Sequence, residues 1–358
     1  MNMLTIVNDQ LSFEFPDVHV EAKLKISFQR TLRIPDDGKQ YPLPPGLGSF
    51  PLRQVDDYQN RIPAKWKEHG GIMLPMFQSE ALWLNFNANS VDRRGSYPFA
   101  IKVAAGKVSA VTGDEWSNGL KAKDYVVAPK QRWLDGYVVE NGLIRQFVAA
   151  PLGSGFSVEE QLTGKPEFGG IQIEVFPMKW GVFKEKFPKF REEKTRGGIV
   201  RSKSLSAMPA SFNYCCEMSF SDDDSLDMGL AAGGLMKQQI FEDPYQMSDW
   251  DTEHGVRCFV HLANSMLWRD ITQTDPPHAP LTAQNYASQG YPWYDYYEDA
   301  PSVSGTAKLQ GIKSLKEIAD QKGITSVMLP NNGSISVPNE KVSNLGPDKR
   351  PGIRNGTW

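Results

Sequence analysis

The alternation of apolar and polar residues predicts that the first half of the chain consists mainly of β-strands. Between residues 19 and 29 every second residue is apolar, and the residues between them are polar. This period of two is typical of a strand with one buried face. Further β-type runs lie at 4–9, 11–15, 81–87, 97–113 and 124–129.

The clearest local signal is a hairpin in "GYVVENGLIRQFVAAPL", residues 136–152. Asn141-Gly142 separates two runs rich in β-branched residues, and this pair favours a type I′ turn, in which both residues have positive φ. The segments 156–164 and 169–179 continue the strand pattern. Many short strands at this spacing indicate a sandwich or a partly open barrel.

Helix signals are few. Residues 62–71 carry Pro63 and Gly70 where a helix would begin and end, and 314–323 combine Ser314 and Glu317 in capping-box spacing. Two more short helices are expected at 265–273 and 281–290. The segment 34–52 is rich in proline and glycine, so we expect an irregular crossing on the surface.

The stretch "MGLAAGGLMKQQIFEDPY", residues 228–245, superficially resembles a nucleotide-binding loop. Its glycines fit neither the dinucleotide-binding G-x-G-x-x-G nor the phosphate-binding G-x-x-x-x-G-K-[ST] spacing. We interpret it as a buried strand in which Gly233 and Gly234 allow a close approach of another backbone.

These patterns predict a mainly β (α+β) fold. We expect a β-sandwich or partly open barrel-like core, with a few short peripheral helices and a disordered C-terminal tail. The predicted organisation is a β-rich first half at 1–183, an exposed basic loop at 184–207, a second half of the same or a closely packed domain at 208–330, and the tail at 331–358.

Charge and hydropathy limit the partners. The 358 residues include 39 Lys and Arg against 42 Asp and Glu, a net charge of -3, which does not suit a general nucleic-acid binder. No apolar run reaches the about 18 residues of a membrane-spanning helix, and the start of the chain does not resemble a signal peptide. We therefore expect a soluble cytoplasmic protein without a nucleic-acid or membrane partner.

The residues that commonly hold metals do not occur in metal-binding patterns. The cysteines are Cys215, Cys216 and Cys258, without C-x-x-C spacing, and the five histidines form no H-x-x-x-H pair. The acidic stretch at 222–227 lacks the spacing of a calcium loop. We predict no metal and no cofactor. His261 is interpreted as a hydrogen-bonded core residue.

Two segments combine aromatic and acidic side chains, which can stack on a ligand and accept its hydrogen bonds. If they converge, they form a groove. The candidate groove residues are Asp243, Tyr245, Asp249, Trp250, Asp251, Trp293, Tyr294 and Asp295. A second candidate set lies at the hairpin and consists of Trp133, Asp135, Arg145 and Gln146.

Several long motifs, among them "WLDGYVVENGLIRQFVAAPLGSGFSVEEQLTG", "MGLAAGGLMKQQIFEDPY" and "YPWYDYYEDA", resemble an uncharacterised family of soluble proteins of roughly 350 residues from bacteria and some fungi. The resemblance covers residues 25–325. It implies one compact unit and carries no activity with it.

Two functions from different classes remain open, and the sequence does not decide whether the protein is an enzyme. The first is a non-catalytic β-rich protein for binding or assembly, with a homo-oligomer or a protein partner. The alternative is a hydrolase of a glycan or similar polar substrate that uses two carboxylates from Asp243, Asp249, Asp251 and Asp295, one of them with a raised pKa.

Overall fold

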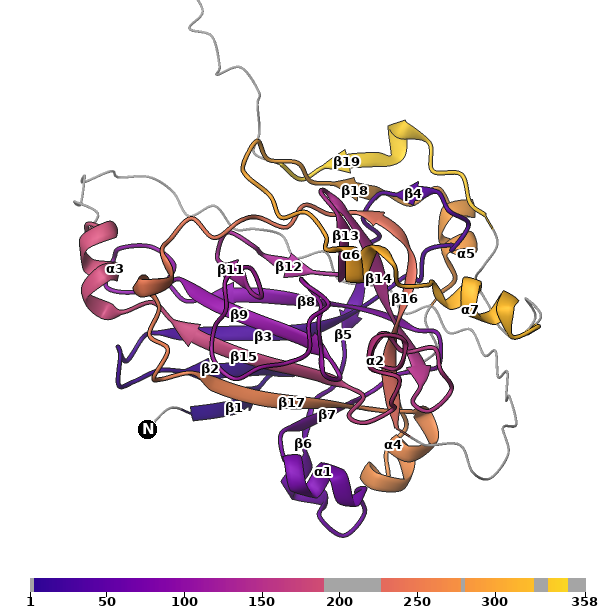
Figure 1. Cartoon of the computed structure of the whole chain (residues 1–358), viewed down its shortest axis with the longest axis horizontal. Coiled ribbons are helices and arrows are strands. Elements are labelled where there is room, and N and C mark those ends of the chain that lie inside the picture. The colour runs from indigo at the N-terminus through magenta and orange to yellow at the C-terminus, as the bar shows by residue number, and fades with distance from the viewer. Residues whose placement is uncertain (1–2, 190–226, 278–280, 325–333, 347–358) are drawn as a thin grey trace, which may run out of the picture.

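A computed structural model describes residues 3–189, 227–277, 281–324 and 334–346, and it is mainly β (Figure 1). All but two of the strands belong to two sheets, and short helices lie at their periphery. In neither sheet do the described strands close into a barrel.

The larger sheet has ten strands and is antiparallel except at one edge, where β16 and β4 pair in parallel. Its central order is β1 (Met3–Val7), β2 (Gln10–Glu14), β3 (Lys23–Thr31), β8 (Ala81–Ala88), β14 (Leu143–Pro151), β16 (Met228–Lys237) and β4 (Gln40–Tyr41). Off this path, β12 (Trp133–Leu134) pairs with β8, β13 (Gly136–Glu140) with β14, and β5 (Gly46–Ser49) with β3.

The second sheet has seven strands in the order β10 (Val108–Ser109), β9 (Phe99–Ala105), β15 (Ile171–Pro177), β17 (Val256–Ala263), β7 (Ile72–Pro75) and β6 (Arg53–Gln54), with β11 (Val126–Ala128) beside β9. A separate pair joins β18 (Trp293–Asp295) to β19 (Val342–Asn344). Within the segment predicted to be a tail, regular structure is confined to a 3-10 turn at Asn339–Lys341 and to β19; 331–333 and 347–358 lie outside the described residues.

One hydrophobic core draws on both sheets and on both predicted halves of the chain. The alternating residues of β3 follow the predicted pattern, since Leu24, Ile26 and Phe28 are fully buried. The proline-rich crossing is not confined to the surface as predicted, because Ile34 and Phe50 are also fully buried in this core.

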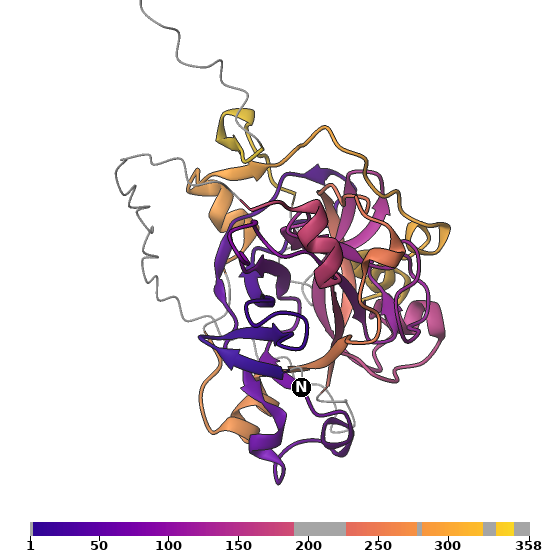
Figure 2. The ribbon, with the colours of Figure 1, turned by 90° about the vertical axis from the view of Figure 1, so that its left-hand side faces the viewer.

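The four predicted helices are confirmed as α1 (Ala64–His69), α4 (Ser265–Thr272), α5 (Ala283–Ser288) and α7 (Leu315–Gln321). α7 begins with the predicted capping box of Ser314 and Glu317. α1 and α4 lie together at one end of the molecule (Figures 1 and 2), where Trp66 and Trp268 belong to a small second core.

Two local predictions were wrong. The segment 156–164 is not a strand but contains α2 (Val158–Thr163), because Ser157 and Glu160 form a capping box at its start. The hairpin is present, but of its two turn residues only Gly142 has a positive φ, and a bulge near Val138 adjusts the register. The turn is therefore not type I′.

Further short helices are α3 (Trp180–Lys186), α6 (Ala307–Gln310) and the 3-10 turns Val55–Tyr58, Met247–Asp249 and Asn339–Lys341. Of the predicted basic loop, 184–189 are described and include the end of α3, while 190–207 lie outside the described residues, as does most of the acidic stretch at 222–227. No helix in the described part of the chain is long and apolar enough to cross a membrane.

The interpretation of 228–245 is confirmed for its strand. Residues 228–237 form β16, and all but the last three of these are buried as a continuous run. A Cβ on Gly234 would lie 2.2 Å from the carbonyl oxygen of Pro35, and one on Gly233 would lie 2.6 Å from a methyl group of Val148. These glycines therefore permit packing, as expected.

Candidate functional site

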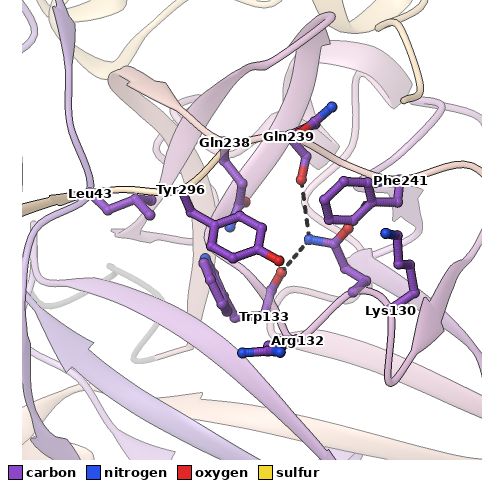
Figure 3. A pocket seen from close by; sticks show the side chains of 9 residues that line it. Leu43, Lys130, Arg132, Trp133, Gln238, Gln239, Phe241 and Tyr296 are labelled. Atoms are coloured by element: carbon purple, nitrogen blue, oxygen red, sulfur yellow. Dashed lines mark hydrogen bonds between the residues drawn. The ribbon is translucent and has the colours of Figure 1, made fainter. Parts of the chain in front are cut away.

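The loop from Pro129 to Trp133, between β11 and β12, separates two adjoining pockets. A small pocket, with room for about one water molecule, is lined by Leu43, Lys130, Gln131, Arg132, Trp133, Gln238, Gln239, Phe241 and Tyr296 (Figure 3). A large pocket of about 520 Å³ is lined by Phe86, Asn87, Ala88, Ser96, Pro129, Lys130, Arg132, Pro244 and Tyr245. The two pockets share Lys130 and Arg132.

Buried glutamines fix this loop to the segment that follows β16. Gln131 Nε2 donates to the carbonyl oxygens of Trp133 (2.8 Å) and Gln239 (3.4 Å), and its Oε1 accepts the backbone N–H of Phe241 (3.0 Å). Gln238 forms two hydrogen bonds with Asp135, one to its backbone N–H (3.0 Å) and one to its carboxyl group (3.2 Å). The loop is therefore held on both sides.

A third segment, near Tyr296, completes the small pocket. Gln239 accepts the backbone N–H of Glu298 and donates to the carbonyl oxygen of Ala300. The Glu298 carboxylate pairs with Lys130, whose ammonium group lies 4.5 Å from the centre of the Phe241 ring, and it also accepts the Tyr296 hydroxyl. Lys130 is thus already engaged within the fold.

Arg132 differs from Lys130. Its side chain is exposed, and within the described chain its guanidinium has no hydrogen bond or ion pair. In Figure 3 it lies on the opposite side of the small pocket from Gln239, beneath Tyr296 and Trp133. Arg132 lines both pockets, as Lys130 does.

The large pocket contains other hydrogen-bonding groups that the described residues leave unused. The side chains of Asn87 and Ser96 and the hydroxyl group of Tyr245 make no hydrogen bond to the described part of the chain. Burial, with the nearby Asp243 and Asp249, raises the pKa of Tyr245, so its hydroxyl keeps its proton at neutral pH. Apolar surface from Phe86, Pro129 and Pro244 forms much of the remaining wall. This combination is typical of a small-molecule site.

The predicted groove residues divide into two groups, and only Tyr245 lines a pocket. Asp243 lies behind it, where its Oδ2 accepts the Tyr125 hydroxyl (2.5 Å) and the Trp250 indole N–H (2.9 Å) and its Oδ1 accepts the Tyr245 N–H (2.8 Å). Trp250 is only 1% exposed, so its ring belongs to the core and cannot stack on a ligand as expected.

The next two acidic residues serve local structure. Asp249 accepts the Gln246 N–H and lies 3.3 Å from the Lys186 ammonium group. Asp251 accepts the N–H groups of Glu253 and His254 and pairs with the His254 ring at 2.8 Å, which raises the pKa of that histidine.

The second group lies at the β18 strand. Trp293 is 1% exposed and packs edge-on against Tyr286, so it too belongs to the core. Tyr294 exchanges two backbone hydrogen bonds with Leu43, and Asp295 pairs with Asn344 of β19. Neither Tyr294 nor Asp295 lines a pocket; the neighbouring Tyr296 does instead.

Of the second predicted set, Trp133 lines the small pocket, where its ring contacts Tyr296 edge-on at 5.2 Å. Asp135 lies behind the pocket, 4% exposed, and burial raises its pKa to about 7, although the Gln238 hydrogen bond opposes this. Gln146 is fully buried and binds the backbone of Leu32 and Ile34.

Arg145, the last member of this set, donates to the carbonyl oxygen of Gly233 at 3.3 Å. Its guanidinium also lies 3.7 Å from Asp36 and 3.6 Å from Glu317. Arg145 therefore connects β14 with β16, Asp36 and α7, and it does not line either pocket.

Sequence reasoning missed Arg132 and the three glutamines. Only their neighbours along the chain indicate them. Gln131 and Arg132 directly precede the predicted Trp133, and Gln238 and Gln239 follow β16 within the glycine-rich stretch 228–245. Their roles depend on contacts between distant segments, which no spacing along the chain reveals.

His261 is a core residue, as expected. Its Nε2 bonds the carbonyl oxygen of Gly70 (2.9 Å), its ring stacks on Trp66, and burial lowers its pKa to about 4. Among the residues that the structure describes, no three His, Cys, Asp or Glu side chains are grouped to hold a metal ion. No known protein family, curated protein or solved structure matches this chain.

Proposed function

We propose that this chain is a non-catalytic binding protein and that its ligand occupies the large pocket. The supporting observation is that Asn87, Ser96, Arg132 and Tyr245 surround one hollow with hydrogen-bonding groups that the described chain does not use. These four side chains are exposed or half-buried, and their grouping around one hollow beside apolar surface is typical of a small-molecule site.

The rigidity of the surrounding loop also supports binding. Gln131 and Gln238 are 3% and 4% exposed, and both are hydrogen-bonded to segments far away in the sequence. A site held in its binding geometry loses little conformational entropy when the ligand arrives.

A binding screen tests the proposal. We expect thermal-shift measurements against sugars, amino acids, aromatic acids and sugar phosphates to give at least one stabilising compound. Asn87→Trp fills the large pocket from β8 and should abolish the shift, because the new ring occupies the hollow. Gln40→Trp is the matched control and should retain the shift, because the Gln40 side chain is exposed and lines neither pocket.

Two outcomes would contradict this proposal. Equal binding by the Asn87→Trp variant would move the site elsewhere. Chemical conversion of the bound compound, detected by mass spectrometry after incubation, would favour the hydrolase alternative. That alternative has less support, because Asp243, Asp249 and Asp251 each accept hydrogen bonds that maintain local structure.

A second candidate, self-association, is favoured by the edge strand β1. Its sequence, MLTIV, contains no charged residue or proline, and Met3, Leu4 and Val7 are 48%, 38% and 41% exposed. Natural edge strands are usually protected by charge, proline or a bulge. We propose that a second copy of the chain pairs with this edge and forms a homo-oligomer.

A further inference from the structure

We infer that the ligand of the large pocket is an organic anion, with a carboxylate or phosphate group at Arg132 and an apolar body against the pocket wall. This inference rests on the proposed function and specifies its ligand class. It is drawn from the charge, the hydrogen-bonding capacity and the apolar surface of the same pocket.

The charge of the lining favours an anion. Lys130 and Arg132 are the only charged residues among those that line the two pockets, and both are basic. The Glu298 carboxylate pairs with Lys130 and accepts the Tyr296 hydroxyl, while Asp243 and Asp249 lie near Tyr245 without lining either pocket. Lys130 is therefore largely neutralised. The hydrogen bond from Lys130, and more weakly the charge of Arg132, lower the pKa of Glu298, but the Arg132 N–H donors make no hydrogen bond within the described chain.

The chemistry of arginine limits the anion further. A guanidinium group presents parallel N–H donors that match the two oxygens of a carboxylate or phosphate. The Arg132 guanidinium makes no hydrogen bond or ion pair in the described chain, and Arg132 lines both pockets. The Tyr245 hydroxyl in the same lining provides one more donor.

The rest of the large pocket suits an apolar body. Pro129, Pro244, Phe86 and Ala88 contribute apolar surface, and the Tyr245 ring lies beside them. A volume of about 520 Å³ is in the range of small-molecule sites. A flat or branched hydrocarbon group attached to the anion would contact these residues, while Asn87 and Ser96 remain available to its polar substituents.

Three probes of similar size separate the possibilities: benzoate carries a carboxylate, phenyl phosphate a phosphate, and benzamide is the neutral counterpart of benzoate. Each is titrated into the full chain and followed by ligand-observed NMR. We expect one or both anions to bind at least about tenfold more tightly than benzamide, because a charge-assisted hydrogen bond is stronger than a neutral one. The preferred anion identifies the carboxylate or phosphate source.

Variants then assign the effect to the site. Arg132→Gln should reduce anion affinity to the level of benzamide, and Arg132→Lys should retain part of it, since the charge remains without the paired donors. Arg269→Gln is the control: Arg269 is 59% exposed, pairs with Asp275 and lies outside both pockets. The Arg269→Gln variant should bind the anions as tightly as the natural chain does.

Equal binding of benzamide and the anions, unchanged anion binding by Arg132→Gln, or no anion binding at millimolar concentration would each overturn the inference. Failure of the proposed function gives a different result. If anions bind through Arg132 but Asn87→Trp has no effect, the large pocket is not the site. If neutral compounds bind and Asn87→Trp blocks them, the pocket stands and only the anion is wrong.

Discussion

At the scale of single residues, Asp135 shows how burial changes chemistry behind the site. Its carboxyl group is 4% exposed, and its raised pKa of about 7 compares with 3.8 for an aspartate in water. Between these values the folded chain keeps a proton that the unfolded chain releases. The free energy of unfolding therefore decreases as the pH rises from about 4 to about 7. The stabilisation that comes from the retained Asp135 proton is fully present only below about pH 4.

Asp135→Asn removes this titration and keeps an oxygen that can accept the Gln238 hydrogen bond. We expect the variant to become more stable relative to the natural chain by about 1–4 kcal/mol as the pH rises through this range, since each pKa unit corresponds to about 1.4 kcal/mol. Urea denaturation of both proteins at several pH values measures the difference. Other buried carboxylates, such as Glu80 and Glu159, titrate in both proteins and cancel. A difference that does not change with pH would contradict the assignment.

The sequence predicted the kinds of side chain near the site, aromatic and acidic, better than it predicted whether each one is buried or lines a pocket. The sequence does not distinguish the buried state of Trp250 and Trp293 from exposure, because Trp250 lies outside any strand or helix and Trp293 begins a strand of only three residues, too short for a clear period. His261 was predicted correctly because its strand neighbours are apolar. Arg132 carried no pattern at all, and only the tertiary structure reveals that its donors are unused.

At the scale of elements, β16 depends on glycine for its packing against the segment of the same chain that contains Pro35. Gly234→Ala would bring the new methyl group to 2.2 Å from the Pro35 carbonyl oxygen, a rigid backbone atom. We expect a loss of about 1–3 kcal/mol in the free energy of unfolding, as for other overpacked sites. Gly181→Ala in α3 is the control, because open space surrounds it and alanine favours helix. Chemical denaturation compares the two, and an equal or smaller loss at Gly234 would refute the packing argument.

Local sequence patterns predicted most elements because their causes are local. The Ser314–Glu317 capping box predicted α7, and the alternation of 19–29 predicted β3. The same Ser-x-x-Glu spacing at Ser157 was overlooked because the flanking residues also fit a strand. The capping hydrogen bonds outweigh β-propensity in so short a segment.

At the scale of the whole molecule, strand order is the part that the sequence could not predict. β4 pairs with β16, and β7 with β17, across almost two hundred residues of chain. Such pairings depend on which apolar faces meet in the core, and many strands have similar faces. The fold class, mainly β with few short helices, can be predicted from the composition and from the period of the hydrophobic pattern. The order of the strands in the sheets cannot.

The exposed edge of β1 makes a prediction about assembly. If a second copy pairs there, native mass spectrometry should detect an oligomer that persists at moderate salt, because the contact is apolar and formed by backbone hydrogen bonds. Leu4→Lys places a charge on this edge and should shift the protein to monomer. Gln40→Lys is the control and should leave the oligomer intact, because the exposed Gln40 side chain lies on β4, at the other end of the sheet order from β1. A monomeric natural chain would end this proposal.

The glutamine contacts at the small pocket have a consequence during synthesis. They connect the loop at 129–133 to residues 238–241 and, through Gln239, to 298–300. Translation delivers these three segments one after another, and domains on the ribosome fold as their parts emerge. A nascent chain released or stalled before residue 298 would lack the final connection and the Glu298 partner of Lys130, so the loop at 129–133 gains its full set of contacts only late in translation.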